Sequence, residues 1–168
     1  MEFMTEFERV LVQSFNTFFT ETGVKGIAHR VKQHRFTPQF LDVLVDSLDP
    51  DYYMGIECKS ISVDKGAKAL YFSQHFTVDK KGSHQIERIS DFLRLSGRAG
   101  FLAVELRMGV GHSREAYIVP WTELDTLFNT EGEKKLSISD LKEYAMIERE
   151  GNRYRIDPAK WKAGRLLG

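Results

Sequence analysis

The sequence LDVLVDSLDPDYYMGIECKS, residues 41–60, decides the fold that we expect for this chain. It contains two runs of β-forming residues, and the DPD segment between them is typical of a turn. Two such runs joined by a short turn predict an antiparallel hairpin. The second run contains Glu57 and Lys59, although burying an unpartnered charge costs roughly several kcal/mol. We therefore expect a partner or a function for these two charges.

Strand geometry brings Glu57 and Lys59 to one face, because successive side chains alternate between the two faces of a sheet. Asp42, at the head of the first run, reaches the same face from the neighbouring strand. Asp46 shares that face and competes with Asp42, but it stands nearer to the turn, so Asp42 is preferred. The alternative interpretation of Glu57 and Lys59 is an ordinary cross-strand pair on a solvated face.

Two carboxylates that lie close together repel unless a proton or a metal ion is between them. Oxygen ligands of this kind suit Mg²⁺ or Mn²⁺. A metal ion at Asp42 and Glu57 would bind a phosphate oxygen and lower the pKa of a bound water. Lys59 would then orient or deprotonate that water, or hold the phosphate.

The composition predicts one compact domain. The chain has 168 residues, 42% of them hydrophobic, and 24 Lys and Arg balance 24 Asp and Glu. This balance gives no sign of a polyanionic partner, so the distribution of charge matters more than its sum. The single cysteine, Cys58, excludes an internal disulfide and a multi-cysteine zinc site. The sequence shows neither a membrane-spanning run nor a signal peptide, so we expect a soluble cytoplasmic protein with no membrane partner.

The spacing of apolar residues predicts an α/β fold. Helices are expected in 5–20, 84–96 and 121–128. Strands are expected in 24–31, 41–47, 52–62, 100–108 and 115–120, with 69–76 as a short strand or an ordered loop. Ser83 is the expected N-cap of the second helix. This order predicts a mixed central β-sheet flanked by α-helices, followed by a short helix and a hairpin that turns at Gly151 and Asn152.

The stretches FLDVLVDS and MGIECKS, with Asp42, Glu57 and Lys59, resemble the motif of the PD-(D/E)XK nuclease superfamily. The helix HQIERISDFL, which contains Gln85, and the following strand GRAGFLAVELR add to this resemblance. Within the superfamily, the chain looks like the Holliday junction resolvases of the archaeal and RecU types. The resemblance implies a restriction-endonuclease-like core in residues 4–130. Residues 131–168 have no counterpart in the family, and we expect them to form an extension with a helix and a hairpin, packed on the same domain. The literal Pro–Asp pair of the motif is absent.

The resemblance also implies the roles of the matched residues. Asp42, Glu57 and the backbone carbonyl of Cys58 would bind Mg²⁺, with Mn²⁺ as a substitute. Lys59 would be the catalytic lysine.

Two further residues are assigned by the same resemblance. Gln85 would be an accessory polar residue near the water or the phosphate, and the alternative is a surface glutamine in the first turn of a helix. Glu8 would match the N-terminal acidic ligand of the family. Glu6 competes with Glu8 if the helix has another register, and a solvated helix face is the alternative for both.

A basic segment leads into Asp42. Residues 24–41 contain six Lys, Arg and His residues and no acidic residue. Such a strip beside a metal site would hold a phosphate backbone without reading its sequence. The alternative is a solvated basic loop. The expected DNA-binding residues are Lys25, Arg30, Lys32, Arg35, Lys65 and Lys68, and Lys80 and Lys81 would extend the strip.

These features predict a Mg²⁺-dependent endodeoxyribonuclease that cuts branched DNA such as Holliday junctions. A four-way junction has two-fold symmetry, so the resemblance also implies a homodimer. Phe72, Phe76 and the C-terminal tail are candidates for its interface, and the sequence does not rank them. The alternatives are a sequence-specific endonuclease of the restriction or homing type and a catalytically inert DNA-binding module on the same fold.

Overall fold

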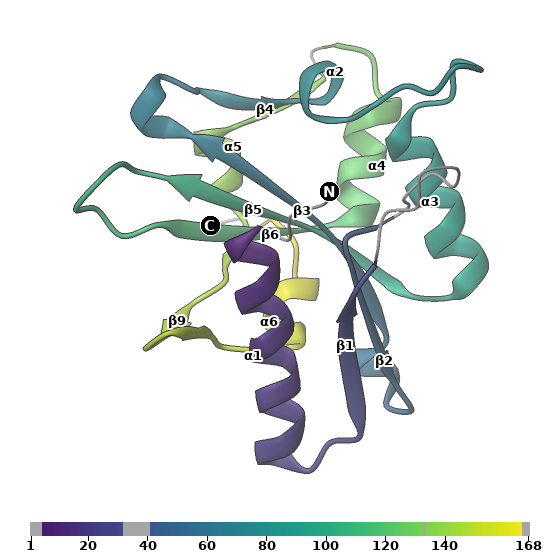
Figure 1. Cartoon of the computed structure of the whole chain (residues 1–168). Coiled ribbons are helices and arrows are strands. Elements are labelled where there is room, and N and C mark those ends of the chain that lie inside the picture. The colour runs from purple at the N-terminus through teal and green to yellow at the C-terminus, as the bar shows by residue number, and fades with distance from the viewer. Residues whose placement is uncertain (1–4, 32–40, 133, 166–168) are drawn as a thin grey trace.

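The computed structural model describes residues 5–31, 41–132 and 134–165 (Figure 1). Its helices are α1 (Glu6–Thr22), α2 (Phe72–His75), α3 (Gln85–Ser96), α4 (Trp121–Asn129), α5 (Ile138–Leu141) and α6 (Pro158–Lys162). Its strands are β1 (Gly26–Arg30), β2 (Val43–Ser47), β3 (Met54–Ser62), β4 (Ala69–Tyr71), β5 (Ala99–Arg107), β6 (Glu115–Pro120), β7 (Lys135–Ser137), β8 (Ala145–Met146), β9 (Arg149–Glu150) and β10 (Arg153–Tyr154). Two 3-10 turns, η1 (Pro50–Tyr52) and η2 (Val63–Lys65), flank β3.

A six-stranded mixed sheet forms the centre of the molecule, in the order β1-β2-β3-β5-β6-β8. β3 and β5 are parallel, and the other neighbouring pairs are antiparallel. α3 lies in the connection from β3 to β5, because parallel strands need a long crossover. This arrangement confirms the predicted α/β fold with a mixed sheet flanked by helices.

The hairpin of β2 and β3 sets the positions of the charged residues. The two strands pair antiparallel, with Val43 opposite Ile56, and the Asp42 N–H donates to the Ile56 carbonyl at 3.2 Å. Asp42 and Val43 therefore both lie against Ile56, and Asp42 is held to β3 next to Glu57, just beyond the paired residues of β2. The turn between the strands contains η1, which confirms the predicted hairpin.

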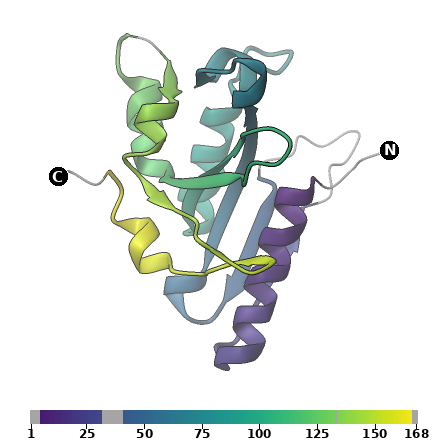
Figure 2. The same ribbon diagram turned by 90° about the vertical axis from the view of Figure 1, so that its left-hand side faces the viewer.

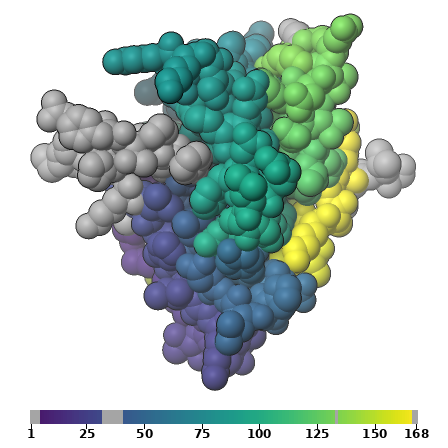
Figure 3. All heavy atoms as spheres, turned by 90° about the vertical axis from the view of Figure 1, so that its right-hand side faces the viewer, coloured from purple at the N-terminus to yellow at the C-terminus, as the bar shows by residue number. Residues whose placement is uncertain are grey.

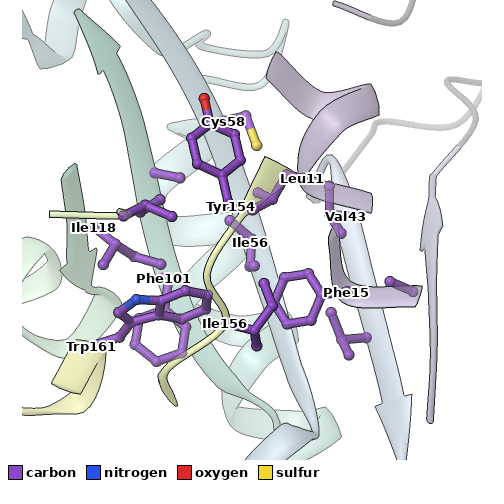
Figure 4. Close-up of a cluster of buried hydrophobic side chains, with 14 of the residues drawn as sticks. Leu11, Phe15, Val43, Ile56, Cys58, Phe101, Ile118, Tyr154, Ile156 and Trp161 are labelled. Carbon is purple, nitrogen blue, oxygen red and sulfur yellow. The ribbon is translucent and has the colours of Figure 1, made fainter. Parts of the chain in front are cut away.

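Helices cover both faces of the sheet (Figure 1). On one face, α1 and the C-terminal segment enclose a core that includes Phe15, Ile56, Phe101 and Trp161 (Figure 4). On the other face, α3 and α4 enclose a second core with residues such as Ile89. β3 is therefore buried on both faces, and its charged residues lie inside the molecule rather than on a solvated face.

α1, Glu6–Thr22, begins and ends within two residues of the predicted range, 5–20. The Thr5 hydroxyl accepts a hydrogen bond from the Glu8 N–H at 3.2 Å and caps the first turn. Gly23 closes the helix with φ at 76°, in the left-handed region that favours glycine. These caps fix which side of α1 faces the sheet.

α3 begins one residue later than an N-cap at Ser83 requires. The Ser83 N–H donates to Asp79 within the preceding loop, and the His84 side chain accepts from the Ile86 N–H. His84 is therefore the N-cap, and the assignment of this role to Ser83 is wrong. Gln85 becomes the first residue of α3.

The C-terminal segment packs on the same sheet as the rest of the chain. β8 continues the sheet beside β6, and β9 and β10 form the predicted hairpin, with Gly151 at φ of 67°. Figure 2 shows this hairpin against α1, where the Tyr154 N–H donates to the Ser14 hydroxyl at 2.8 Å. Trp161 of α6 is 1% exposed and completes the core on that face.

The two aromatic residues predicted as candidates for a dimer interface are buried. Phe72 and Phe76 are 1% and 3% exposed, so the structure contradicts their assignment to a dimer interface. They fill the core beneath α3 and α4 instead. Within residues 5–31, 41–132 and 134–165, no helix has the length and apolar character that crossing a membrane requires.

Candidate active site

Glu57 is the centre of a buried polar cluster on β3. Glu57 is 2% exposed, and its contacts with Lys59 and Gln85 are made by the same oxygen. Oε2 lies 3.2 Å from Lys59 Nζ and accepts a hydrogen bond from Gln85 Nε2 at 3.0 Å. Oε1 is buried and has no hydrogen-bond partner among the described residues. A buried oxygen of this kind is normally satisfied by a partner that completes the site.

Asp42 lies beside Glu57 at the start of β2. Its Oδ2 accepts a hydrogen bond from the Cys58 N–H at 2.8 Å, which holds the carboxylate at the edge of β3. Burial and the nearby Asp42 charge raise the pKa of Glu57 well above its usual value, and the Lys59 ammonium opposes this rise. The structure therefore brings the two predicted carboxylates together.

Cys58 contributes its backbone rather than its thiol. Burial raises the pKa of the thiol well above its usual value, and the surrounding carboxylates of Asp42, Glu8 and Glu57 raise it further. A thiol in this environment stays protonated. The Cys58 carbonyl points to the same edge of β3 as its N–H, toward Asp42.

Glu8, rather than Glu6, faces the cluster. Glu8 is 8% exposed and accepts a hydrogen bond from Arg30 Nε at 3.2 Å. Burial and the Asp42 charge raise the pKa of Glu8, whereas the bond from Arg30 lowers it. Glu6 is exposed and lies 3.6 Å from Arg114. The structure thus places Glu8 beside Asp42, where it is neutralised by an arginine.

Gln85 is a buried residue, so the alternative of a surface glutamine is wrong. It is 9% exposed at the first turn of α3. Its Oε1 accepts from the Thr77 N–H at 3.1 Å, so its Nε2 is the donor toward Glu57. A neutral donor at this place stabilises the charged form of the carboxylate.

Asp46 does not compete for the site. Its carboxylate lies 2.8 Å from Arg98 and 3.0 Å from His29, and these contacts lower its pKa below the usual value despite partial burial. Asp46 pairs with Ile27 of β1, several residues along β2 from Asp42. Its charge is used to hold Arg98 under the hairpin.

The donors at Asp42 and Glu57 fit a hard divalent cation. Both are carboxylates, the Glu57 Oε1 atom lacks a partner in the described ranges, and the Cys58 carbonyl faces the same edge. Mg²⁺ keeps several waters and binds proteins through one or two carboxylates. Across the described part of the chain, no three or more His, Cys, Asp or Glu side chains group together as metal ligands.

The predicted DNA-binding residues are spread over the molecule. Lys25 precedes β1 at the end far from Asp42, because β1 runs from Gly26 opposite Ser47 to Arg30 opposite Val43. Arg30 is near the site, but its guanidinium contacts Glu8. The other expected residues are Lys65 and Lys68, which are exposed around η2, and Lys32 and Arg35, which lie outside the described residues.

Two features near the site could not be found from the sequence. Phe76 lies with its ring 4.6 Å from Lys59 Nζ. Glu105 of β5 is 1% exposed and accepts from the Ser60 hydroxyl at 3.2 Å, with Arg107 and Arg114 at 3.4 and 3.5 Å. The only sequence signal for Glu105 is one acidic residue within an apolar strand.

A hollow of about 510 Å³ lies between α3 and α4, on the face shown in Figure 3. Its walls include Ser90, Trp121 and Asp125, which are linked because the Ser90 hydroxyl donates to Asp125 and accepts from Trp121 Nε1. It contains none of the predicted site residues. The cluster around Glu57 is thus identified by its chemistry rather than by the size of a pocket.

Comparisons with known proteins give similarity to solved structures alone. No family model matches the chain, and no curated protein matches it. Among solved structures, the chain is similar to Hjc, a Holliday junction resolvase from the archaeal hyperthermophile Archaeoglobus fulgidus. The two are 17% identical, the match covers 77% of this chain and 90% of that chain, and the TM-score is 0.44. Similarity at this level assigns no residue role and no substrate.

Proposed function

We propose that this chain is a metal-dependent DNA endonuclease that acts on branched DNA, with Asp42, Glu57 and Lys59 as its catalytic set. The observation that carries the proposal is the unpartnered Glu57 Oε1, buried in the described structure beside the Asp42 carboxylate. Lys59 lies on the other oxygen of the same carboxylate. Two acids and one amine held this closely are costly for the fold, and this cost is explained if they perform chemistry.

In this proposal Asp42, Glu57 and the Cys58 carbonyl hold Mg²⁺, or Mn²⁺ in its place. When bound, the ion neutralises charge on the phosphate and lowers the pKa of a water. Lys59 and Gln85 favour the charged form of Glu57 against the effects of burial and Asp42, and Asp42 is held by the Cys58 N–H. Lys59 presents its remaining N–H groups to the phosphate and the attacking water.

The choice of branched DNA is supported by the motif and its order in the chain, not by a groove in the structure. The E-x-K-S pattern of Glu57 to Ser60, the Gln85 helix and the strand that follows it resemble the resolvases. A homodimer follows from the same proposal, because two opposed cuts in a four-way junction need two active sites.

The test is cleavage of matched DNA substrates. The protein is incubated with Mg²⁺ and, in parallel, with a labelled four-way junction, a linear duplex of the same sequence and single-stranded DNA. We expect symmetric cuts in the junction that disappear in Lys59→Ala. Lys162→Ala is the matched control, because Lys162 is an exposed lysine that contacts Asp51 at the far end of the hairpin.

Each other result has a definite meaning. Equal cutting of the linear duplex would show that ordinary duplex DNA is the substrate. It would favour an endonuclease of the restriction or homing type. DNA binding without cutting in Mg²⁺ or Mn²⁺ would favour the inert DNA-binding module. Cutting that survives in Lys59→Ala would refute the assignment of the site.

A further inference from the structure

Lys59 is held in place by two contacts. Its Nζ lies 3.2 Å from Glu57 Oε2 and 4.6 Å from the centroid of the Phe76 ring. The face of an aromatic ring attracts a cation, and it does so more strongly where water is excluded. The Lys59 side chain is 18% exposed, so the ring faces a partly desolvated ammonium.

Phe76 is itself fixed by its packing. It is 3% exposed, and the rings of Phe72 and Trp121 meet it nearly at right angles, with centroids 6.1 and 6.3 Å away. The Phe76 N–H also donates to the Phe72 carbonyl at 3.3 Å. Because the Phe76 ring is fixed by this packing, its contact with the Lys59 ammonium is also fixed in position.

The same segment is tied to Glu57. Thr77, which follows Phe76, accepts from the Gln85 N–H at 2.8 Å and donates its own N–H to Gln85 Oε1 at 3.1 Å. The Gln85 amide is therefore oriented with Nε2 toward Glu57 Oε2. The adjacent residues Phe76 and Thr77 thus act on the same site: Phe76 contacts Lys59, and Thr77 orients the Gln85 amide that binds Glu57.

We propose that Phe76 is a positioning residue for Lys59. Its ring keeps the ammonium beside Glu57 Oε2 and away from Oε1, so that Oε1 is left for the metal ion. This inference rests on the proposed function, in which Lys59 acts at the phosphate. A residue that only filled the core would tolerate any ring of the same shape, whereas a positioning ring must also have an electron-rich face.

The first experiment changes the charge distribution of the ring and keeps its shape. With 3,4,5-trifluorophenylalanine at position 76, we expect the cleavage rate of the junction to fall about tenfold while KM stays the same. The same substitution at Phe72 is the control, because Phe72 is equally buried and contacts Phe76. Thermal unfolding of both variants shows that each is folded. A variant at position 76 that cuts at the wild-type rate would overturn the proposal.

The second experiment needs no cleavage. The ring current of Phe76 shifts the ε-methylene protons of Lys59 upfield in the NMR spectrum. We expect Phe76→Leu to move these signals to the position of an exposed lysine such as Lys65, and Phe72→Leu to leave them shifted. Signals of Lys59 at the exposed position in the wild-type protein would refute the proposal. If the wild type cuts no DNA but shows the shift, the proposed function fails and the positioning of Lys59 by Phe76 stands.

Discussion

The two oxygens of the Glu57 carboxylate differ in their hydrogen-bond partners. Oε2 is satisfied by Lys59 and Gln85, whereas Oε1 is buried without a partner in the described residues. A buried acceptor left without a partner costs about 1–3 kcal/mol. Because Asp42 raises this cost further by its charge, the arrangement stores free energy that a bound cation would release.

Metal binding should weaken as the pH falls. Burial and the Asp42 charge raise the pKa of Glu57 well above its usual value, so protons compete with the metal at a higher pH than at an exposed carboxylate. Below the raised pKa, the apparent Mg²⁺ affinity should fall about tenfold per pH unit, and above it the affinity should be constant. Titration calorimetry with Mg²⁺ or Mn²⁺ over a pH series measures this. Glu57→Gln should abolish binding, and the exposed Glu148→Gln should not.

An affinity that stays constant down to the ordinary range of an exposed carboxyl would contradict this prediction. It would mean that Glu57 is either not a ligand or not desolvated in solution.

Arg30 should stabilise the fold by neutralising Glu8. In Arg30→Met, the buried Glu8 keeps its charge beside Asp42, and we expect the free energy of unfolding at neutral pH to fall by about 1–3 kcal/mol. The raised pKa of Glu8 shows that its charge is already unfavourable there. The loss should shrink as the pH falls toward the usual pKa of a glutamate, because Glu8 is then neutral in both states.

A double-mutant cycle in urea checks this pairing. Glu8→Gln should recover most of the stability lost in Arg30→Met, whereas the exposed Glu6→Gln should not. Purely additive effects of Arg30→Met and Glu8→Gln would contradict the prediction.

The sequence predicts contacts between side chains only where the local geometry of a strand or hairpin determines them. The alternation of a strand is enough to place Glu57 and Lys59 on one face, and the hairpin brings Asp42 next to them. Phe76 and Glu105 could not be placed, since their contacts depend on how distant segments pack. The contact of Arg98 with Asp46, which removes the competitor of Asp42, depends on the same long-range packing.

The helices and strands were predictable for a similar reason. Long apolar patterns such as those of α1 and β5 persist whatever packs against them, and the long elements occur in the expected order, whereas β7 and α6 were not predicted. Short elements were harder. The capping of α3 by His84 rather than Ser83 depends on Asp79, whose carboxylate takes the Ser83 N–H into the preceding loop. β8 has two residues, and the neighbouring β6 determines its pairing.

The close packing of β3 beneath the start of β2 should make Gly55 sensitive to substitution. A Cβ at Gly55 would lie 2.5 Å from Leu41 Cδ1 and 3.3 Å from Leu93 Cδ2, and Leu41 is 1% exposed. Gly55→Ala must therefore push Leu41, which directly precedes Asp42. We expect a loss of about 1–3 kcal/mol in unfolding free energy, measured in urea, and a weaker affinity for Mg²⁺.

Removing the clashing atom tests this cause. The double variant Gly55→Ala with Leu41→Ala should bind Mg²⁺ more tightly than Gly55→Ala alone. Wild-type stability and affinity in the single variant would show that the hairpin accommodates the added methyl group without moving Asp42.

The net charge of the chain does not indicate where DNA would bind, so the individual basic residues near the site have to be considered. The chain carries no net charge, and Arg30, the basic residue of β1 nearest to the site, contacts Glu8. Lys80 and Lys81 are exposed in the loop that precedes Gln85, and Lys65 follows the end of β3. A phosphate backbone held by these residues would pass over the edge of the sheet where Lys59 lies.

A dimer with two independent active sites should cut the two strands of a junction separately. In a mixed dimer of the wild type and Lys59→Ala, only one site keeps its catalytic lysine. Because a four-way junction presents two equivalent strands to a two-fold dimer, we expect such a heterodimer to nick one strand and to leave the junction unresolved. The heterodimer is isolated with two different affinity tags and tested on a supercoiled plasmid that extrudes a junction. Nicked circles should replace linear product, and Lys162→Ala in place of Lys59→Ala should restore linear product. Linear product from the Lys59→Ala heterodimer would show that one site makes both cuts, and a chain that sediments as a monomer with the junction would exclude the dimer itself.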